Sequence, residues 1–342
     1  MEERPDADEI SRALSEFLSE ASPASDWWLN FAYHYTDVRN AVKILESGCI
    51  LSRERVEQEG RMRTDNANPS VIDQSEHSHD WARLYFRPKT PTQYRNEGIK
   101  PRSEAEKGHC PVPVFFLFDL ECVLRMEGVK FSNSGLNKVH ATETYSRPED
   151  LVSDRMPAKE IYSYGYYNTS KRPYIKDRRH AEIVIKEKLP LEPCLRGLMC
   201  RSVAEKETIN YLIKKSEISK EGARKYKPLI KSASQGDLFY KDWTFVENVG
   251  VELKDSGRGR KGTLVEFSFW PSSRNAAEYD YEVVLQSIDT KNAYRAKGVY
   301  EHWRSNKIRI EVDEVIRNIR INLMLDGELA YAADRSVKRV YN

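Results

Sequence analysis

The sequence lacks the short motifs that mark most nucleotide-dependent and metal-dependent enzymes. No GxGxxG turn joins an expected strand to an expected helix, and neither a GxxxxGK(S/T) phosphate loop nor an HExxH helix occurs. These absences exclude the usual dinucleotide-binding fold, the P-loop NTPases and the common zinc proteases. Any nucleotide chemistry must therefore use a different fold.

Cysteine is scarce, with five residues in a chain of 342. Their positions, 49, 110, 122, 194 and 200, give no CxxC pair and no His/Cys spacing of a metal site, and their number is odd. We therefore expect reduced thiols and no bound metal.

Long apolar runs and an excess of charge of either sign are also missing. No stretch approaches the length of a membrane span, and the N-terminus opens with acidic residues rather than with the basic and apolar run of a signal peptide. We expect a cytoplasmic protein with no membrane partner. Because 55 basic side chains balance 53 acidic ones, any affinity for nucleic acid must come from a local patch.

Helical and strand patterns alternate through the first part of the chain and give way to strands alone in the second. Residues 31–36 and the continuous apolar run 112–118 are typical of strands, and a helix is expected from Asp37 to a stop at Gly48. From about Asp237, short runs alternate with period two and are separated by turn clusters. We expect an α+β domain over residues 1–235 and a small β-rich, sandwich-like domain over residues 236–342.

Glu182 is the residue that most suggests chemistry. It is a lone carboxylate in the apolar run 181–185, where it must find a partner or line a cleft. Alternation places Ala181, Ile183 and Ile185 on one face of a strand and Glu182 with Val184 on the other. The alternative is an edge-strand glutamate that faces solvent or pairs with an arginine.

Two further features could bind a nucleotide or a polynucleotide. His34 and Thr36 occupy alternate positions of one expected strand and present an imidazole and a hydroxyl on one face. The segment 171–180 concentrates positive charge directly before Glu182, where it could neutralise phosphates. A half-buried structural histidine and a solvated loop are the respective alternatives.

Taken together, three stretches resemble the DarT family, the NAD-dependent DNA ADP-ribosyltransferase toxins of bacterial toxin–antitoxin systems. The matching stretches are 33–36 with the helix that ends at Gly48, then 79–91, and finally 179–184. They occur in the family's order within residues 30–215, and several ordered motifs are more specific than one.

The resemblance implies a split β-sandwich with flanking helices, and an NAD cleft with the following roles. It assigns catalysis to Glu182, to Arg63 as the NAD-clamping arginine and to His140 as a proton acceptor. The implied NAD contacts are His34, Thr36, Ser52, Arg53, Tyr85 and Thr92. The implied contacts to the acceptor are Asn133, Asn137, Arg178 and Arg179. The family's arginine-rich helix is replaced here by the loop around Arg63, so Arg53 is a second candidate for the clamping arginine.

The implied reaction transfers ADP-ribose from NAD to a base of single-stranded DNA or RNA and releases nicotinamide. An unpaired base is favoured because flipping a base out of a duplex costs a few kcal/mol. An antitoxin protein is the implied partner. Transfer to a protein, or a non-catalytic nucleic-acid-binding or partner-binding role, stays open on the residues alone.

Overall fold

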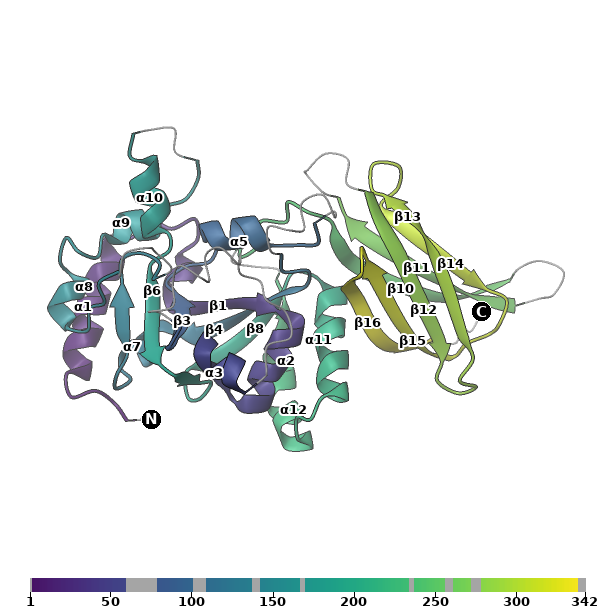
Figure 1. The fold of residues 1–342 in the computed structure, drawn as a ribbon, viewed down its shortest axis with the longest axis horizontal. Coiled ribbons are helices and arrows are strands. Elements are labelled where there is room, and N and C mark those ends of the chain that lie inside the picture. Colours follow the sequence, from purple (N-terminus) through teal and green to yellow (C-terminus); the bar gives the residue numbers. More distant parts are fainter. Residues whose placement is uncertain are drawn as a thin grey trace.

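The computed structural model describes residues 2–59, 79–100, 109–136, 142–166, 170–233, 237–255, 261–271 and 278–337. An α+β part and a β-sandwich lie side by side along the long axis, as Figure 1 shows. This arrangement confirms the predicted α+β class with an added β-rich part. Within the described ranges, no helix is long and apolar enough to cross a membrane.

A seven-stranded sheet in the order β5-β6-β3-β1-β4-β8-β9 forms the centre of the first part. All neighbouring strands are antiparallel except the parallel pair of β8 with β9. The predicted strand at 112–118 is β4, at the buried middle of this sheet. The strands are β1 (Phe31–Asp37), β3 (Trp81–Tyr85), β4 (Pro113–Asp119), β5 (Lys130–Ser132), β6 (Glu182–Lys186), β8 (Leu195–Cys200) and β9 (Ile230–Ser232), and β2 (Cys49–Leu51) pairs with β7 (Lys188–Pro190) in a separate small sheet.

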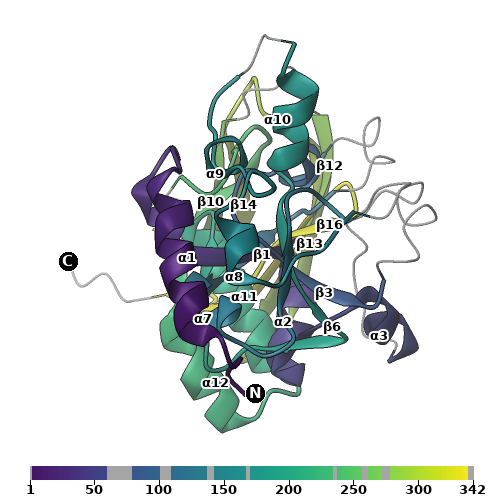
Figure 2. The same ribbon diagram turned by 90° about the vertical axis from the view of Figure 1, so that its left-hand side faces the viewer.

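The helices of this part begin and end where capping chemistry favours it. The Asp37 carboxylate accepts the Arg39 amide at the start of α2 (Val38–Ser47), and Gly48 ends that helix in the left-handed conformation, as the sequence predicts. Figure 2 shows α1 running beside α8. The helices are α1 (Ala7–Ser19), α2, α3 (Arg53–Gln58), α5 (Pro91–Asn96), α7 (Leu120–Leu124), α8 (Pro148–Leu151), α9 (Ala158–Ile161), α10 (Arg172–Arg178), α11 (Val203–Lys215) and α12 (Lys220–Tyr226).

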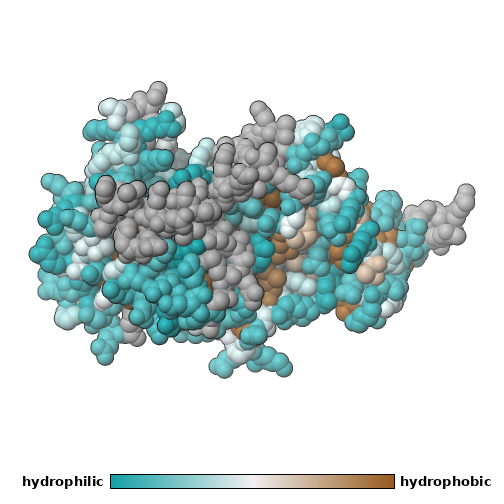
Figure 3. Space-filling model, in the orientation of Figure 1, coloured by the Kyte–Doolittle hydropathy of each residue, from teal (hydrophilic) through white to brown (hydrophobic). Residues whose placement is uncertain are grey.

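The second part is a sandwich of a three-stranded and a four-stranded sheet, which confirms the predicted sandwich. Period-two alternation turns one row of apolar side chains inward from each strand and leaves a polar row outside. Figure 3 shows hydrophobic residues on the visible face of this part, whereas the first part is mostly hydrophilic on that side. The sheets are β10 (Phe245–Asp255), β11 (Lys261–Trp270) and β14 (Lys307–Val312), and β13 (Ala293–Glu301), β12 (Glu278–Ser287), β15 (Asn318–Leu325) and β16 (Glu328–Ser336).

Helix α11 joins the two parts by packing against β16. Tyr331 donates its hydroxyl hydrogen to a Glu207 carboxylate oxygen at 2.6 Å, and Arg335 pairs with the same carboxylate. The Ala332 amide donates to the Thr208 hydroxyl at 3.2 Å. The two parts therefore share a junction with polar contacts, and the boundary near residue 235 stays a prediction.

The expectation of reduced thiols is wrong for one pair, because Cys122 and Cys194 form a disulfide. Cys122 lies in α7, and Cys194 lies just before β8. The Asp119 amide donates to the Cys194 carbonyl at 2.9 Å, which brings the start of β8 against the start of α7. This contact is tertiary, so no spacing in the sequence revealed it. Cys49, Cys110 and Cys200 are free thiols.

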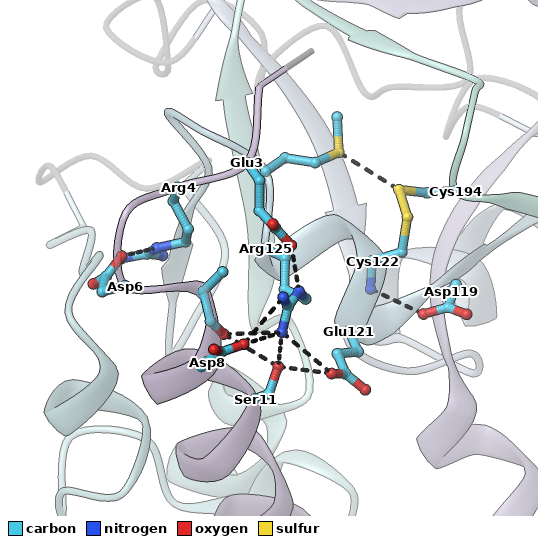
Figure 4. Close-up of polar contacts among 12 residues, drawn as sticks. Glu3, Arg4, Asp6, Asp8, Ser11, Asp119, Glu121, Cys122, Arg125 and Cys194 are labelled. Carbon is cyan, nitrogen blue, oxygen red and sulfur yellow. Dashed lines mark hydrogen bonds and ion pairs between the residues drawn. A yellow bond between two sulfur atoms is a disulfide. The ribbon is translucent and has the colours of Figure 1, made fainter.

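Arg125, next to the disulfide, fastens the N-terminal segment to α7 (Figure 4). Its guanidinium contacts Glu3 at 2.7 Å, Asp8 at 3.2 Å and the Ser11 hydroxyl at 2.7 Å. One side chain thus ties α1 and the residues before it to the body of the sheet.

Reduction of the disulfide is expected to lower the free energy of unfolding by about 2–4 kcal/mol, because the bond restricts an unfolded chain between residues 72 positions apart. Urea unfolding with and without dithiothreitol measures the difference. Cys122→Ser should abolish the response to the reductant, and Cys49→Ser should preserve it. An unchanged midpoint in the wild-type protein would contradict a stabilising bond.

Candidate active site around Glu182

Glu182 opens strand β6 with its carboxylate buried at 2% exposure. One carboxylate oxygen accepts the Leu136 amide at 2.9 Å, and the other lies 3.9 Å from a guanidinium nitrogen of Arg83. Strand β6 lies between β5 and β3, so Glu182 is not an edge residue facing solvent. The carboxylate is therefore held inside the sheet with few partners for its charge.

Burial raises the pKa of Glu182 above its ordinary value, whereas the nearby Arg83 charge and the Leu136 amide act to lower it. A raised pKa means that the carboxylate is a stronger proton acceptor than a glutamate in water. Such a group can stabilise positive charge when ionised and take up a proton more readily than a glutamate in water.

Tyr85 lies directly opposite Glu182 in the β3–β6 ladder, and Tyr33 lies opposite Tyr85 in the β1–β3 ladder. Opposed residues of antiparallel strands point to the same face, so these three side chains share one face of the sheet. Burial, and after it the Glu182 charge, raises the pKa of Tyr85, which keeps its phenol neutral. The Thr92 side chain of α5 acts to lower the pKa of Tyr85.

His34 lies beside Tyr33 on β1, and its imidazole bridges to the neighbouring strand. Its Nδ1 is 3.1 Å from the Arg83 carbonyl oxygen, which can only accept, so Nδ1 carries the proton and Nε2 presents a lone pair. Burial lowers the pKa of His34 to about 4, so the ring is neutral at physiological pH. Alternation places His34 and the buried Thr36 on the face opposite Glu182.

Ser52 and Arg53 lie at the other end of β6. The Ser52 amide donates to the Glu187 carbonyl at 2.7 Å, and Arg53 pairs with Glu57 at 2.7 Å within α3. Glu187 follows Glu182 by five residues, which is roughly 16 Å along an extended strand. Ser52 and Arg53 therefore lie well away from Glu182.

The basic run before Glu182 is a helix rather than the expected loop. Pro173 in its first turn and the buried Ile175 favour the helical conformation of α10. Arg178 donates to the Asn133 carbonyl at 3.0 Å, and Arg179 donates to the Ser163 hydroxyl at 3.2 Å and the Gly165 carbonyl at 2.9 Å. Both arginines thus brace loops around the site.

The predicted residues with described positions divide into four groups. Tyr85 shares the face of Glu182 and is influenced by Thr92, and Asn133, Arg178 and Arg179 lie in the loop and helix beside the site. His34 and Thr36 lie on the opposite face, and Ser52 and Arg53 lie at the far end of β6. Arg63, Asn137 and His140 lie outside the described residues. Among the residues with described positions, no group of three or more His, Cys, Asp or Glu could hold a metal ion.

Sequence reasoning missed Arg83 and the Leu136 amide, which are the two groups nearest the Glu182 carboxylate. Arg83 was within reach, because period-two alternation from Tyr85 puts it on the face of the catalytic candidate. The Leu136 amide leaves no signal in the sequence, since any residue could supply it.

His34 is expected to remain neutral from pH 5 to pH 8 with its proton on Nδ1, because burial opposes the charged form. Two-dimensional ¹H–¹⁵N spectra of histidine-labelled protein would report the tautomer, with His34→Gln to assign the signals. A titration near 6.5, the value of a histidine in water, would contradict the burial.

The family model described as "ssDNA thymidine ADP-ribosyltransferase, DarT" matches residues 33–227. Comparison with curated proteins finds no match. The match to the family model confirms the predicted family and its enzyme class, and it contains Glu182, Tyr85 and His34.

Solved structures with weaker similarity include DarT of Thermus sp. 2.9 in complex with ADP-ribosylated ssDNA, at 17% identity and a TM-score of 0.46, covering 62% of this chain and 96% of that one. The same protein in complex with NAD+ gives 17% identity and a TM-score of 0.44, with 62% and 98% covered. Thermosipho africanus DarTG in complex with ADP-ribose gives 14% identity and a TM-score of 0.43, with 54% and 47% covered. Since the family model spans more than half of the chain, this protein belongs to the DarT family of ssDNA thymidine ADP-ribosyltransferases.

Proposed function

We propose that this protein transfers ADP-ribose from NAD to a thymidine base of single-stranded DNA, with Glu182 as the catalytic carboxylate. The observation that carries the proposal is the burial of Glu182 beside Tyr85, with a raised pKa and few partners for its charge. A carboxylate in such surroundings costs stability, and groups of this kind concentrate at functional sites.

NAD cleavage is the first step. The Glu182 carboxylate accepts a hydrogen bond from a hydroxyl of the nicotinamide ribose, and Tyr85 lines the nicotinamide side. As the glycosidic bond breaks, its electron pair leaves with nicotinamide and positive charge develops on the ribose. A buried carboxylate stabilises that charge more than one in water does, because the low local dielectric strengthens the attraction.

Attack by thymine completes the transfer. One ring nitrogen of thymine, N1, bonds the deoxyribose, so N3 is the ring nitrogen that can attack the anomeric carbon. The N3 proton passes to Glu182, whose raised pKa suits it to accept a proton, or to His140. In a duplex N3 is paired, so a single strand presents it at lower cost.

The remaining roles follow the family resemblance. We propose that Ser52, Arg53 and Arg63 bind NAD, that Asn133, Asn137, Arg178 and Arg179 help position the acceptor, and that an antitoxin protein restrains the enzyme in the cytoplasm. The predicted NAD contacts of His34 and Thr36 do not fit a nucleotide held at Glu182, because both residues lie on the opposite face of the sheet. The cytoplasm is reducing, and disulfides are rare there. In that compartment, the Cys122–Cys194 bond would accordingly be reduced in a fraction of the protein molecules.

Glu182→Gln should lower transfer at least about 10²–10³-fold, because the amide cannot supply the charge that stabilises the cleaving bond. Transfer of radiolabelled ADP-ribose to a thymidine-containing oligonucleotide measures the loss. The matched control is Glu187→Gln, an exposed glutamate on the same stretch of chain. Activity retained by Glu182→Gln would remove this residue from the mechanism.

The acceptor is tested by offering the same enzyme four polymers with labelled NAD. Single-stranded DNA that contains thymidine should be labelled, whereas the same DNA without thymidine, uridine-containing RNA and a protein mixture should not. Equal labelling of RNA or protein would replace the proposed acceptor while leaving the enzyme class in place.

Arg83→Gln should shift the acidic limb of the kcat/KM profile to higher pH. Arg83 lowers the pKa of Glu182, so its removal raises that pKa further, and the required carboxylate is then lost at a higher pH as the solution is acidified. Lys186→Gln, an exposed cation on the same strand, is the control and should leave the limb in place. A shift to lower pH in Arg83→Gln would contradict the assignment.

A further inference from the structure

The segment 237–241, which follows the family region and leads into the sandwich, is bound to α5 and its flanks. The binding residues, Lys89, Gln93 and Glu97, are spaced four apart. The contacts are Lys89 Nζ to an Asp237 carboxylate oxygen at 2.5 Å, the Gln93 side-chain amide to the Leu238 carbonyl at 2.8 Å, and the Glu97 carboxylate to the backbone amides of Tyr240 and Lys241 at 3.0 and 2.9 Å.

The α5 side of these contacts is buried. Gln93 is 1% and Glu97 3% exposed, and the Glu97 carboxylate also lies 3.8 Å from the buried guanidinium of Arg201. A buried carboxylate that loses such partners destabilises the structure, so the segment cannot detach freely. The Tyr240 hydroxyl adds a hydrogen bond to the Lys89 carbonyl at 2.6 Å.

The same segment lies on the face of the sheet that carries Glu182. Phe239 packs on Phe115, with ring centroids 5.3 Å apart, and both belong to the cluster of Tyr33, against which Tyr85 packs. Tyr85 in turn lies opposite Glu182. Residues from outside the family region therefore cover part of the candidate active face.

Tyrosine rings and cations alternate along the surface that begins at this segment. Tyr240 contacts Tyr94, with ring centroids 5.2 Å apart, and the Lys89 ammonium lies 5.6 Å from the centroids of both Tyr240 and Tyr164. Further along, the Arg172 guanidinium lies 5.0 Å from the centroid of Tyr166. We name Tyr94, Tyr164, Tyr166, Tyr240, Lys89 and Arg172 the tyrosine track.

Tyr94, Tyr164, Tyr166 and Arg172 of the tyrosine track are exposed, whereas Lys89 is buried, and the track adjoins the site at two points. Tyr94, Tyr164 and Tyr166 are 47%, 52% and 75% exposed. Arg179, at the end of the helix that leads into β6, holds the loop between Tyr164 and Tyr166 through the Gly165 carbonyl. At the other end, α5 carries Tyr94 together with Thr92, whose side chain acts on the pKa of Tyr85. Figure 1 shows α5, which carries Tyr94, and α10, which begins at Arg172, on the upper side of the first part.

We propose that nucleotides of the acceptor strand next to the modified base stack on the tyrosine track, and that Tyr240 extends this surface from outside the family region. Exposed aromatic rings beside an exposed cation suit a single strand, whose bases stack on the rings while a phosphate pairs with Arg172. The inference rests on the proposed function, because it assigns the path of that function's substrate.

The test compares the affinities of the full-length protein for a fluorescein-labelled trinucleotide and for a 12-nucleotide strand with the same central thymidine, by fluorescence anisotropy. The wild-type protein should prefer the long strand. Tyr94→Ala and Tyr166→Ala should each reduce that preference by roughly five- to a hundredfold, the effect of losing one stacked base. The matched control is Trp303→Ala, an aromatic residue 48% exposed on the sandwich, which should keep the wild-type preference.

Tyr240 is tested with a pair of variants, because its ring is partly buried. Tyr240→Phe keeps the ring and should keep the preference for the long strand, whereas Tyr240→Ala should lose it. Thermal melting identifies any variant that has lost its fold. If Tyr240→Ala has lost its fold, the length preferences of Tyr240→Phe and of Tyr94→Ala decide whether the track binds the strand. A preference unchanged in Tyr94→Ala and Tyr166→Ala would overturn the inference.

These experiments distinguish a failure of this inference from a failure of the proposed function. Glu182→Gln should abolish transfer and still bind the long strand more tightly than the short one. If Glu182→Gln loses transfer while the track variants keep the length preference, this inference alone fails. If Glu182→Gln retains transfer, the proposed catalytic role fails whatever the track variants show.

Discussion

The burial of the Glu182 carboxylate is the constraint on which the candidate site depends. Its direct partners are the Leu136 amide and a guanidinium 3.9 Å away. Full pairing would hold the carboxylate in its charged form and reduce its value as a proton acceptor, whereas solvent would screen its attraction for a developing cation. A partly paired, buried carboxylate can both accept a proton and stabilise a developing cation. Its burial costs stability, which the rest of the sheet must offset.

The packing of the seven-stranded sheet offsets that cost in stability, and the order of its strands determines which groups surround Glu182. Strand β6 is flanked by β5 and β3, so Glu182 receives an amide from the loop after β5 and both Arg83 and Tyr85 from β3. The apolar β4 and the helices on the other face bury a continuous core beneath these strands. Rigid strands fix the side chains of such a site more closely than loops do.

The sandwich contacts the α+β part through side chains as well as through the segment that connects them. Helix α11 packs on β16, and Glu97 binds the backbone of the segment that leads into the sandwich. Because Leu238 and Phe239 of that segment lie in the cluster that also contacts Tyr85, loss of the segment together with the sandwich would uncover part of the face that carries Glu182. The second part therefore contributes to the shape of the site as well as to the surface beside it.

The sequence by itself determined the local elements: the strand at 112–118, the Asp37 cap with its Gly48 stop, and a lone glutamate in an apolar strand. Periodicity, capping and burial are properties of neighbouring residues, and a single sequence contains them. The reaction was predicted from the family motifs, which occur in this chain in the family's order. Only the tertiary structure decided that Cys122 meets Cys194, that Arg83 faces Glu182 and that residues 237–241 lie against α5. Each of these pairs residues far apart in the chain, and such pairing depends on sheet order and register, which local patterns do not specify.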